Sequence, residues 1–324
     1  MPGEKMLYLS RKDVESVGVP VAEIIDTLEL MFREKGEGRV EMPPKPGIHT
    51  RPDAFIHAMP AYIPALNSAG MKWVSGYPEN PGRGLPYING LMVLNDPETG
   101  VPVCVMDCGW VTAKRTGAAT AVAAKYLARR DSEVVGVLGC GVQGFSNVEA
   151  LSCIFDIKKV TAYDILDEAA NRYRRKVGDD LGIEVEVVAT PEAAVRGSDI
   201  VVTAGPILKH PDPAIEDDWF EPGAFASPVD FDSYWKHEPF QRADKFYTDD
   251  VKQMLYYREV GYFKGIPEEI LDLGDLVAGK SPGRERDDER IFSVNLGLAL
   301  DDMATAPLVY RRALVMGIGR QLDL

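Results

Sequence analysis

Three glycines at a fixed spacing are the clearest chemical signal in the chain. Gly139, Gly141 and Gly144 lie in "VVGVLGCGVQGFS", which begins as an apolar strand and continues as a helix. The first glycine permits a tight turn, the second lets a diphosphate approach the backbone, and the third lets helix and strand pack closely. Amides at the helix start then face the anion with the favourable end of the helix dipole. The spacing therefore predicts a turn that binds the diphosphate of a dinucleotide.

An acidic residue follows where a dinucleotide needs one. Asp164 ends the next apolar segment, "KKVTAYD", twenty residues after Gly144. A carboxylate there accepts hydrogen bonds from both ribose hydroxyls and repels a 2′-phosphate, so we predict NAD as cofactor and disfavour NADP. A glycine-rich turn alone also suits an ordinary strand-to-helix connection, but here strand, helix, second strand and acid occur in register. The candidate cofactor-binding residues are Thr116, Gly139, Gly141, Val142, Gln143, Gly144, Asp164 and Thr203.

Basic residues in apolar surroundings are the candidates for a substrate site, since a nicotinamide enzyme must orient its substrate and manage one proton. Lys72, in "GMKWVSG", either points to solvent from a half-buried strand or faces a cleft as an acid or base of lowered pKa. Arg115 and Thr116 are expected to begin an alanine-rich helix, where a guanidinium and free amides could bind a carboxylate. An ordinary surface arginine is the alternative.

Other candidates have weaker support from spacing alone. Lys45 in "PPKPG" also fits a solvated loop lysine, His57 in "FIHAMPA" an ordinary sheet histidine, and Tyr87 in "GLPYING" is a further candidate substrate contact. Asp230 and Asp232 follow a predicted strand, "GAFAS", and aspartates in such loops often cap helices or form turns. The four histidines form no metal cluster. We therefore predict no metal.

Composition limits the class of protein. The formal net charge of −14 argues against a nucleic-acid partner, because the phosphates would be approached against repulsion. No uninterrupted apolar run approaches the ~20 residues that span a bilayer. The four cysteines follow no zinc spacing, and the start "MPGEKMLYLSRKD" lacks the apolar stretch of a secretion signal. We expect a cytoplasmic protein without a membrane partner.

The order of elements predicts two domains, as does the length of 324 residues. Residues 10–36 have a helical period, and residues 55–106 predict a mostly antiparallel sheet. After the alanine-rich helix, strands and helices alternate from residue 132, which predicts an α/β fold with a Rossmann-type doubly wound parallel sheet. We place the domain change near residue 130. The amphipathic segment 293–319 is expected to be helical and could pack on the first domain.

Many ordered segments together resemble the ornithine cyclodeaminase/μ-crystallin family over nearly the whole chain. They are "AMPAY", "MKWVSGYPENPGRGLP", "LNDPETGVP", "KRTGAATAVAAKYLARR", "GVLGCGVQG", "AYDI", "LGDLVAGKSPGR" and "GLALDDMATA". The stretch from "RTGAA" to "AYDI" is most similar to the archaeal alanine dehydrogenases. The resemblance implies a homodimer, with an α+β substrate-binding and dimerisation domain at 1–130 and 300–324 and an NAD-binding Rossmann domain at 131–299.

The resemblance also implies roles for residues. Lys72 and Arg115 would hold a substrate carboxylate or assist proton transfer, and Asp232, rather than Asp230, takes the position of the family's active-site aspartate. The family usually has arginine at Lys45, and true cyclodeaminases tend to have glutamate at His57, which weakens the case for ornithine. The implied function is an NAD-dependent dehydrogenase or imine reductase acting on a small L-amino acid. Ornithine cyclodeaminase, a cyclic ketimine reductase and a non-enzymatic dinucleotide-binding protein are the alternatives.

Overall fold

The computed structural model describes residues 5–324 and divides into two compact units. The first unit contains the chain up to Arg115 together with Leu298–Leu324, and the second contains Thr116–Gly297. Residues 1–4 of the predicted first domain lie outside the described residues. The division falls inside α3 (Gly109–Leu127), whereas the alternation of elements placed the domain change near residue 130.

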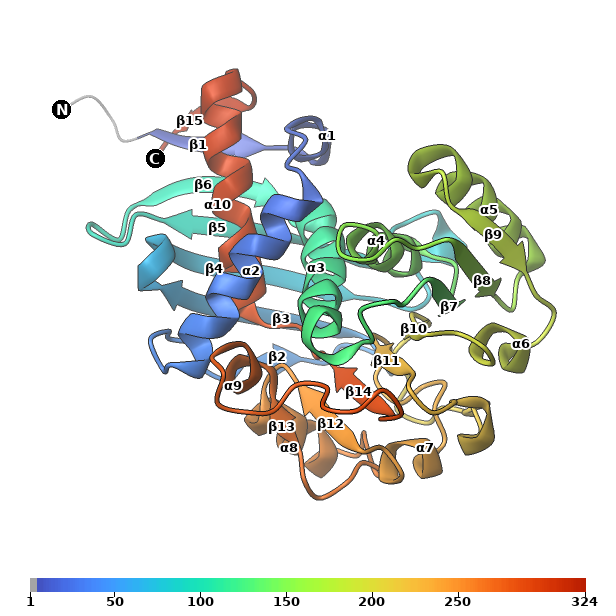
Figure 1. Cartoon of the computed structure of the whole chain (residues 1–324). Coiled ribbons are helices and arrows are strands. Elements are labelled where there is room, and N and C mark those ends of the chain that lie inside the picture. Colours follow the sequence, from blue (N-terminus) through green and yellow to red (C-terminus); the bar gives the residue numbers. More distant parts are fainter. Residues whose placement is uncertain (1–4) are drawn as a thin grey trace. The chain divides into compact units, whose positions relative to one another are not determined.

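The first unit is built on a seven-stranded sheet (Figure 1). Neighbouring strands are antiparallel except β1 and β6, so the prediction of a mostly antiparallel sheet is confirmed. Short 3₁₀ turns follow β3 and β4, at Pro64–Leu66 and Pro81–Arg83. In sheet order the strands are β15 (Arg320–Asp323), β1 (Lys5–Leu9), β6 (Pro102–Asp107), β5 (Ile88–Asn95), β4 (Ser68–Gly76), β3 (Phe55–Ile63) and β2 (Gly47–Ile48).

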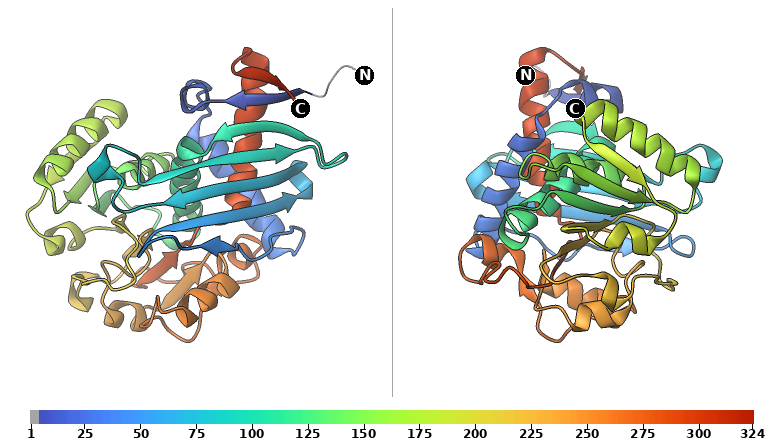
Figure 2. Two further views of the ribbon diagram at one scale, coloured as in Figure 1. Left: turned by 180° about the vertical axis from the view of Figure 1, so that it is seen from behind. Right: turned by 45° about the vertical axis from the view of Figure 1, so that its right-hand side comes forward.

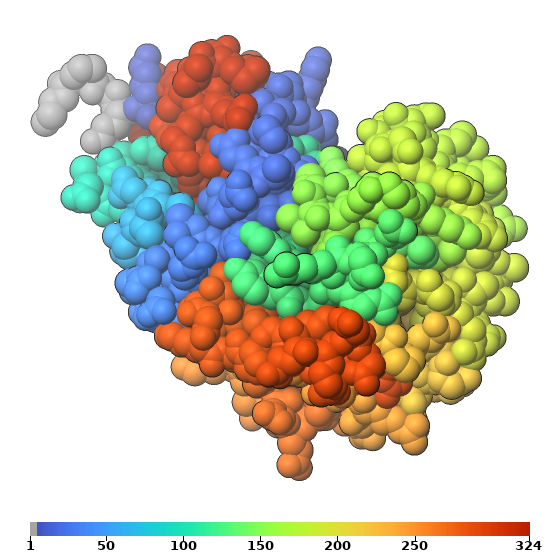
Figure 3. Space-filling view, in the orientation of Figure 1, coloured from blue at the N-terminus to red at the C-terminus, as the bar shows by residue number. Residues whose placement is uncertain are grey.

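Helices cover one face of this sheet. α10 (Ala299–Met316) packs against β3, β4 and α2 (Val21–Gly36), and α1 (Arg11–Ser16) lies beside β1 and β6. A flank of α2 and the C-terminal end of α10 reach the outer surface (Figure 3). Among residues 5–324, no helix covers the opposite face of strands β3–β6 (Figure 2). The C-terminal helix thus packs on the first unit as predicted, although it begins at Ala299 rather than at residue 293. Residues 291–294 before it form a strand, as the segment "RIFSV" suggests.

The second unit is built on an eight-stranded sheet in which every pair of neighbouring strands is parallel. The predicted doubly wound sheet is confirmed: from β7 the chain proceeds outward through β8 and β9, then returns to β10 on the other side of β7. In sheet order the strands are β13 (Leu271–Asp272), β12 (Lys245–Thr248), β14 (Ile291–Val294), β11 (Phe225–Pro228), β10 (Ile200–Thr203), β7 (Val134–Leu138), β8 (Lys159–Tyr163) and β9 (Glu184–Val187).

The position where the strand order reverses is the place at which this fold usually binds ligands. β7 and β10 meet there, and their carboxyl ends lie side by side because the two strands are parallel. Both strands are almost fully buried apolar runs, as expected for a parallel sheet covered on both faces.

The helices of the unit, besides the end of α3, are α4 (Val142–Leu151), α5 (Asp167–Leu181), α6 (Pro191–Val195), α7 (His237–Gln241), α8 (Val251–Glu259) and α9 (Leu273–Val277), with a 3₁₀ turn at Asp217–Trp219.

Within the described part of the chain, no helix has both the length and the hydropathy that a membrane crossing requires.

Candidate active site

The turn between β7 and α4 has the geometry that its three glycines predict. Gly139 has a φ of +100°, and a Cβ there would lie 2.6 Å from the carbonyl carbon of Ala204. A Cβ on Gly144 would lie 2.3 Å from the Gly139 carbonyl oxygen, so helix and strand meet without room for a side chain. A Cβ on Gly141 would meet no heavy atom within 4 Å, and no side chain caps the helix that starts there. The turn therefore leaves space for a diphosphate beside bare amides.

Asp164 is held beside this turn by the backbone. Its Oδ2 accepts a hydrogen bond from the amide of Cys140 at 2.8 Å, and its Oδ1 accepts one from the amide of Leu166 at 2.9 Å. Each oxygen has a second lone pair for a ribose hydroxyl. Ile165 and Leu166 next to it are 78% and 61% exposed, which leaves apolar surface beside the carboxylate. These residues fit the adenosine half of a dinucleotide.

The remaining cofactor candidates differ in access. Val142 is exposed in the first turn of α4, and Gln143 accepts a hydrogen bond from Ser146 Oγ through its Oε1 at 3.2 Å. Thr203 is fully buried, and its hydroxyl donates to Asp230 and accepts from the indole of Trp235. Its side chain thus serves contacts within the protein.

The expectation that Arg115 and Thr116 begin a helix is wrong. α3 begins at Gly109, whose amide donates to Asp107 Oδ1 at 2.9 Å, so the aspartate satisfies the helix start six residues before Arg115. The backbone amides of Arg115 and Thr116 lie inside the helix. Only side chains at these positions could contact a substrate.

Lys72 and Arg115 meet in a buried group of four charges, which we call the four-charge cluster: Lys72, Arg115, Asp301 and Asp302. Lys72 Nζ lies 2.7 Å from Asp302 Oδ2, and Arg115 Nε lies 3.2 Å from Asp302 Oδ1. Arg115 Nη1 lies 3.2 Å from Asp301 Oδ2. The Lys72 side chain is 1% exposed and both aspartates are fully buried, which excludes the solvent-facing alternative for Lys72. Two cations and two carboxylates balance one another.

Burial makes Lys72 a group that can exchange a proton near neutral pH. Loss of solvation lowers the pKa of Lys72 to about 8, and the charge of Arg115 acts in the same direction. Asp302 opposes this change, because a carboxylate at 2.7 Å favours the protonated amine. The geometry thus gives an amine that is protonated yet poised to lose its proton.

Sequence reasoning missed Asp301 and Asp302. Both stand in "GLALDDMATA", a stretch otherwise apolar, and α10 buries this part on β3 and β4. Asp301 Oδ2 also accepts a hydrogen bond from the amide of Leu298 at 3.0 Å, so it caps the helix as well. A pair of adjacent acids inside an apolar helical segment was the signal that could have identified them.

His57 lies on the sheet face that carries Lys72, and Lys45 is close enough for its charge to act on His57. His57 pairs with Val74 and Met59 with Lys72, so His57 and Lys72 belong to the same face of the sheet. Burial first, then the charges of Lys45, His49 and Lys72, lower the pKa of His57 to about 4. His57 is therefore neutral at pH 7. Tyr87 lies just before β5, where its carbonyl oxygen accepts the amide hydrogen of Tyr77 at 3.0 Å.

The two aspartates after β11 have different environments. Asp230 is fully buried; its Oδ1 accepts from Thr203 Oγ1 at 2.6 Å and its Oδ2 from the amide of Gly205 at 3.0 Å. Burial raises its pKa to about 7. Asp232 is half-buried, and its Oδ2 accepts from the amide of Phe263 at 2.9 Å. Burial raises the pKa of Asp232, while hydrogen bonds from backbone amides and the charges of His237 and Lys264 oppose the rise. Asp230 thus stabilises the chain around Thr203 and Gly205 through hydrogen bonds. Asp232 is the more solvent-accessible of the two carboxylates.

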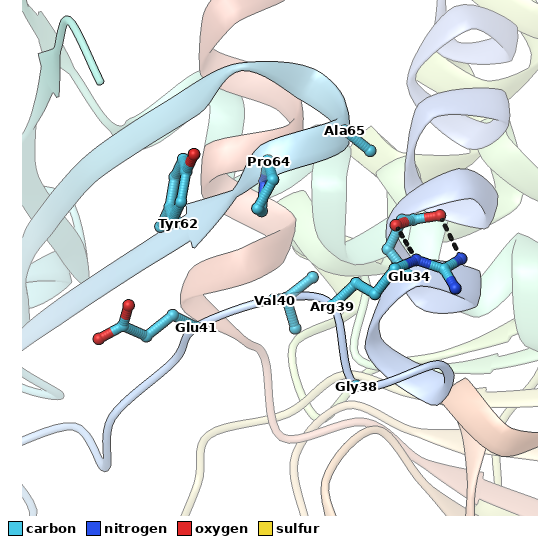
Figure 4. A pocket seen from close by; sticks show the side chains of 8 residues that line it. All are labelled: Glu34, Gly38, Arg39, Val40, Glu41, Tyr62, Pro64 and Ala65. Carbon is cyan, nitrogen blue, oxygen red and sulfur yellow. Dashed lines mark hydrogen bonds and ion pairs between the residues drawn. The ribbon is translucent and has the colours of Figure 1, made fainter. Parts of the chain in front are cut away.

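A cavity of about 690 Å³ lies elsewhere in the first unit. In Figure 4 its wall includes the ion pair of Arg39 with Glu34, whose two N–O distances are each 2.8 Å. None of the candidate site residues lines it. The lining residues are Glu34, Gly38, Arg39, Val40, Glu41, Tyr62, Pro64 and Ala65.

The doubly wound sheet, the glycine turn and Asp164 define a protein with a Rossmann-type dinucleotide fold joined to an α+β unit that contains a buried lysine. The chain belongs to the ornithine cyclodeaminase/mu-crystallin family, whose model matches residues 4–316.

Relatives with similar sequences cover nearly the whole chain. The nodulation efficiency protein NfeD of Rhizobium meliloti is 38% identical over 96% of this chain and 97% of its own. The alanine dehydrogenase of Archaeoglobus fulgidus is 36% identical over 98% of both chains.

Solved structures match the same extent of chain. An archaeal alanine dehydrogenase dimer with bound NAD has a TM-score of 0.88 and 34% identity, covering 99% of this chain and 100% of that one. The Δ¹-pyrroline-2-carboxylate reductase of Thermococcus litoralis, in complex with NADH and L-proline, has a TM-score of 0.87 and 32% identity, covering 97% and 99%.

Proposed function

We propose that this protein is an NAD-dependent oxidoreductase that interconverts a small L-amino acid and its imine or 2-oxo acid, as an alanine dehydrogenase does. One observation carries the proposal: the open backbone at Gly141 next to the fixed carboxylate of Asp164. The bound NAD and NADH in two structures with more than 30% identity support it further.

The second unit would hold the cofactor. Amides at residues 141–144 would bind the diphosphate, and Asp164 would accept hydrogen bonds from the hydroxyls of the adenosine ribose. Bound NAD would accept a hydride from the substrate α-carbon. A 2′-phosphate would meet the charge of Asp164, and Asp167 and Glu168 follow in the first turn of α5, so we propose NAD rather than NADP.

The first unit would contribute the proton-transfer group and the contacts for the substrate carboxylate. Asp301 and Asp302 already balance Lys72 and Arg115, so we assign proton transfer to Lys72 and carboxylate binding to Arg115 together with Lys45. Neutral His57 could donate or accept a hydrogen bond beside them.

Asp232 would act on the amino group. As the α-carbon gives up its hydride, the amino nitrogen loses a proton, and an imine forms. Asp232 would accept that proton and then assist the addition of water, after which ammonia leaves and a 2-oxo acid remains. Its partial burial, with one oxygen held by the amide of Phe263, suits an acid that contacts a ligand.

A second candidate is the reduction of a cyclic imine such as Δ¹-pyrroline-2-carboxylate. The structure with NADH and L-proline favours it, because that relative is nearly as similar as the alanine dehydrogenase. The same residues would serve, with a proton passing from Asp232 to the imine nitrogen instead of leaving it.

A substrate panel tests the proposal. The purified protein is incubated with NAD and L-alanine, L-proline or L-ornithine, and NADH and ammonia are measured. NADH and ammonia formed in equal amounts from L-alanine support a dehydrogenase. In a second assay, the protein is incubated with NADH and Δ¹-pyrroline-2-carboxylate. NADH consumption that is faster than NADH formation from L-alanine supports the second candidate.

Two other results would reject both candidates. Proline and ammonia formed from L-ornithine without net NADH indicate a cyclodeaminase, and tight NADH binding without any turnover indicates a binding protein. Asp232→Asn is measured in parallel, and unchanged turnover in this variant would remove Asp232 from the mechanism.

We also propose a homodimer, formed through the outer face of the sheet in the first unit. This face, opposite α10, exposes 46% of Trp73 and 43% of Leu91, which are partners on neighbouring strands, and 38% of Tyr8. Apolar sheet faces of this kind usually mark interaction sites. Light scattering on the wild type and on Trp73→Glu tests the proposal, which expects a dimer and a monomer respectively; a wild-type monomer would contradict it.

A further inference from the structure

Two phenylalanines on either side of the Asp232 carboxylate have unusual backbones. Phe231 precedes Asp232 directly and has a φ of +65°, and Phe263 has a φ of +52°. A positive φ is unfavourable for a bulky residue, whereas glycine adopts it without strain. Such strain persists only where the surroundings fix the conformation, and it gathers at functional sites. Phenylalanine at both positions therefore indicates that the rings themselves are needed.

The rings pack together and hold both backbones. The ring centroids of Phe231 and Phe263 are 4.8 Å apart. The centroid of the Phe231 ring also lies 5.1 Å from that of Tyr257 and 5.7 Å from that of Tyr262. Phe231 is 5% exposed and Phe263 is fully buried. Burial of apolar rings at these spacings is favourable and offsets the strain.

The strained backbone reaches Asp232 directly. The amide of Phe263 donates to Asp232 Oδ2 at 2.9 Å, so the conformation of residue 263 aims this N–H at the carboxylate. At the other side, the φ of Phe231 sets the direction in which the chain enters Asp232. The donor and the acceptor of this hydrogen bond, the Phe263 amide and the Asp232 carboxylate, thus both depend on the packing of the Phe231 and Phe263 rings.

We propose that Phe231 and Phe263 form an aromatic clamp that fixes the carboxylate of Asp232. They are positioning residues: neither touches the substrate, and both act through Asp232. The inference rests on the proposed function, in which Asp232 contacts the amino group. A displacement of about 1 Å in a catalytic group can lower a rate about 100-fold, so a clamp of this kind has a measurable effect.

The test compares Phe231→Gly and Phe231→Ala with Phe246→Ala. Phe246 is 2% exposed in β12 of the same unit, and its ring lies 5.6 Å from that of Phe240 and 6.2 Å from that of Phe292, so its truncation removes an equally buried ring stacked on other partners. For each protein we measure kcat and KM for L-alanine with NAD, and for Δ¹-pyrroline-2-carboxylate with NADH, at several pH values. The Kd for NADH and the melting temperature are measured as well.

The clamp predicts that both Phe231 variants lose kcat about tenfold to 100-fold, while the Kd for NADH changes less than about twofold. The acidic limb of the kcat/KM profile moves to higher pH, because loss of the Phe263 hydrogen bond raises the pKa of Asp232. Phe231→Gly melts above Phe231→Ala, since only glycine tolerates a φ of +65° without strain. Phe246→Ala lowers the melting temperature and leaves kcat and the acidic limb unchanged.

A readout without turnover separates failure of the clamp from failure of the proposed function. Carbon NMR of labelled aspartate, assigned by comparison with Asp232→Asn, gives the pKa of Asp232 whether or not L-alanine reacts. A higher pKa in Phe231→Gly supports the clamp even if the substrate is wrong. An unchanged pKa or wild-type kcat in Phe231→Gly overturns it, as does an equal loss of kcat in Phe246→Ala. If Phe231→Gly does not fold, Phe231→Leu is measured against the same criteria.

Discussion

The two units would handle anions in different ways. In the second unit, the turn at residues 139–144 offers backbone amides and the helix dipole, and no side chain caps the start of α4. In the first unit, the four-charge cluster uses ionised side chains that neutralise one another in a buried place. Amides do not titrate, whereas the pKa of Lys72 is lowered to about 8. Cofactor affinity should therefore change little with pH, and turnover should change strongly.

Removal of the titrating amine has the largest expected effect. Lys72→Met should lower kcat about 100-fold to 10,000-fold, which is the usual contribution of a positioned acid or base. The Kd for NADH, measured by calorimetry, should stay within about twofold of the wild type. Lys12→Met, which removes an exposed lysine from the same unit, is the control and should change neither value. If Lys72→Met weakened NADH binding by as large a factor as it lowered kcat, the two units would not have separate roles.

The two adjacent aspartates of α10 provide a matched pair. Asp302→Asn leaves the buried ammonium of Lys72 without its carboxylate, and loss of one partner of a buried ion pair destabilises a protein by about 3–5 kcal/mol. The same change lowers the pKa of Lys72, because Asp302 had raised it. The limb of the pH–rate profile that reports Lys72 should therefore move to lower pH.

Asp301→Asn separates this effect from simple loss of stability. Asp301 contacts Arg115 and caps α10, and Lys72 pairs with Asp302. The variant should lower the free energy of unfolding, measured with urea, and shift the Lys72 limb less than Asp302→Asn. A shift of equal size in both variants would assign the pKa of Lys72 to the cluster as a whole.

Replacement of the ribose carboxylate should have the smallest effect. Asp164→Asn removes the charge but keeps an oxygen for the amide of Cys140 or Leu166, so the fold should persist. NADPH should then bind about tenfold more tightly than to the wild type, as the repulsion of the 2′-phosphate disappears. Titration of both proteins with NADH and NADPH measures the change, and an unaltered preference would show that another residue selects the cofactor.

The difference between the units also explains which features could be predicted. The turn and Asp164 are close in sequence, and parallel strands are read as apolar runs, so their local pattern was sufficient. The four-charge cluster joins β4, α3 and α10, which are far apart in the chain and meet only because α10 packs on the sheet. Its lysine and arginine were identified as candidates, but their carboxylate partners were not. The start of α3 was misplaced because the capping role of Asp107 is not visible in the alanine-rich pattern that follows.

The position of Gly141 gives the most direct test of the central claim that the turn binds a dinucleotide diphosphate. A Cβ at Gly141 meets no protein atom within 4 Å, so Gly141→Ala should fold with a melting temperature close to that of the wild type. The methyl group would occupy the place of the diphosphate. We therefore predict that the wild type binds NADH in calorimetry and that Gly141→Ala binds it at least about tenfold more weakly, the equivalent of about 1.4 kcal/mol. Absence of NADH binding to folded wild-type protein, or equal affinity in Gly141→Ala, would contradict the account.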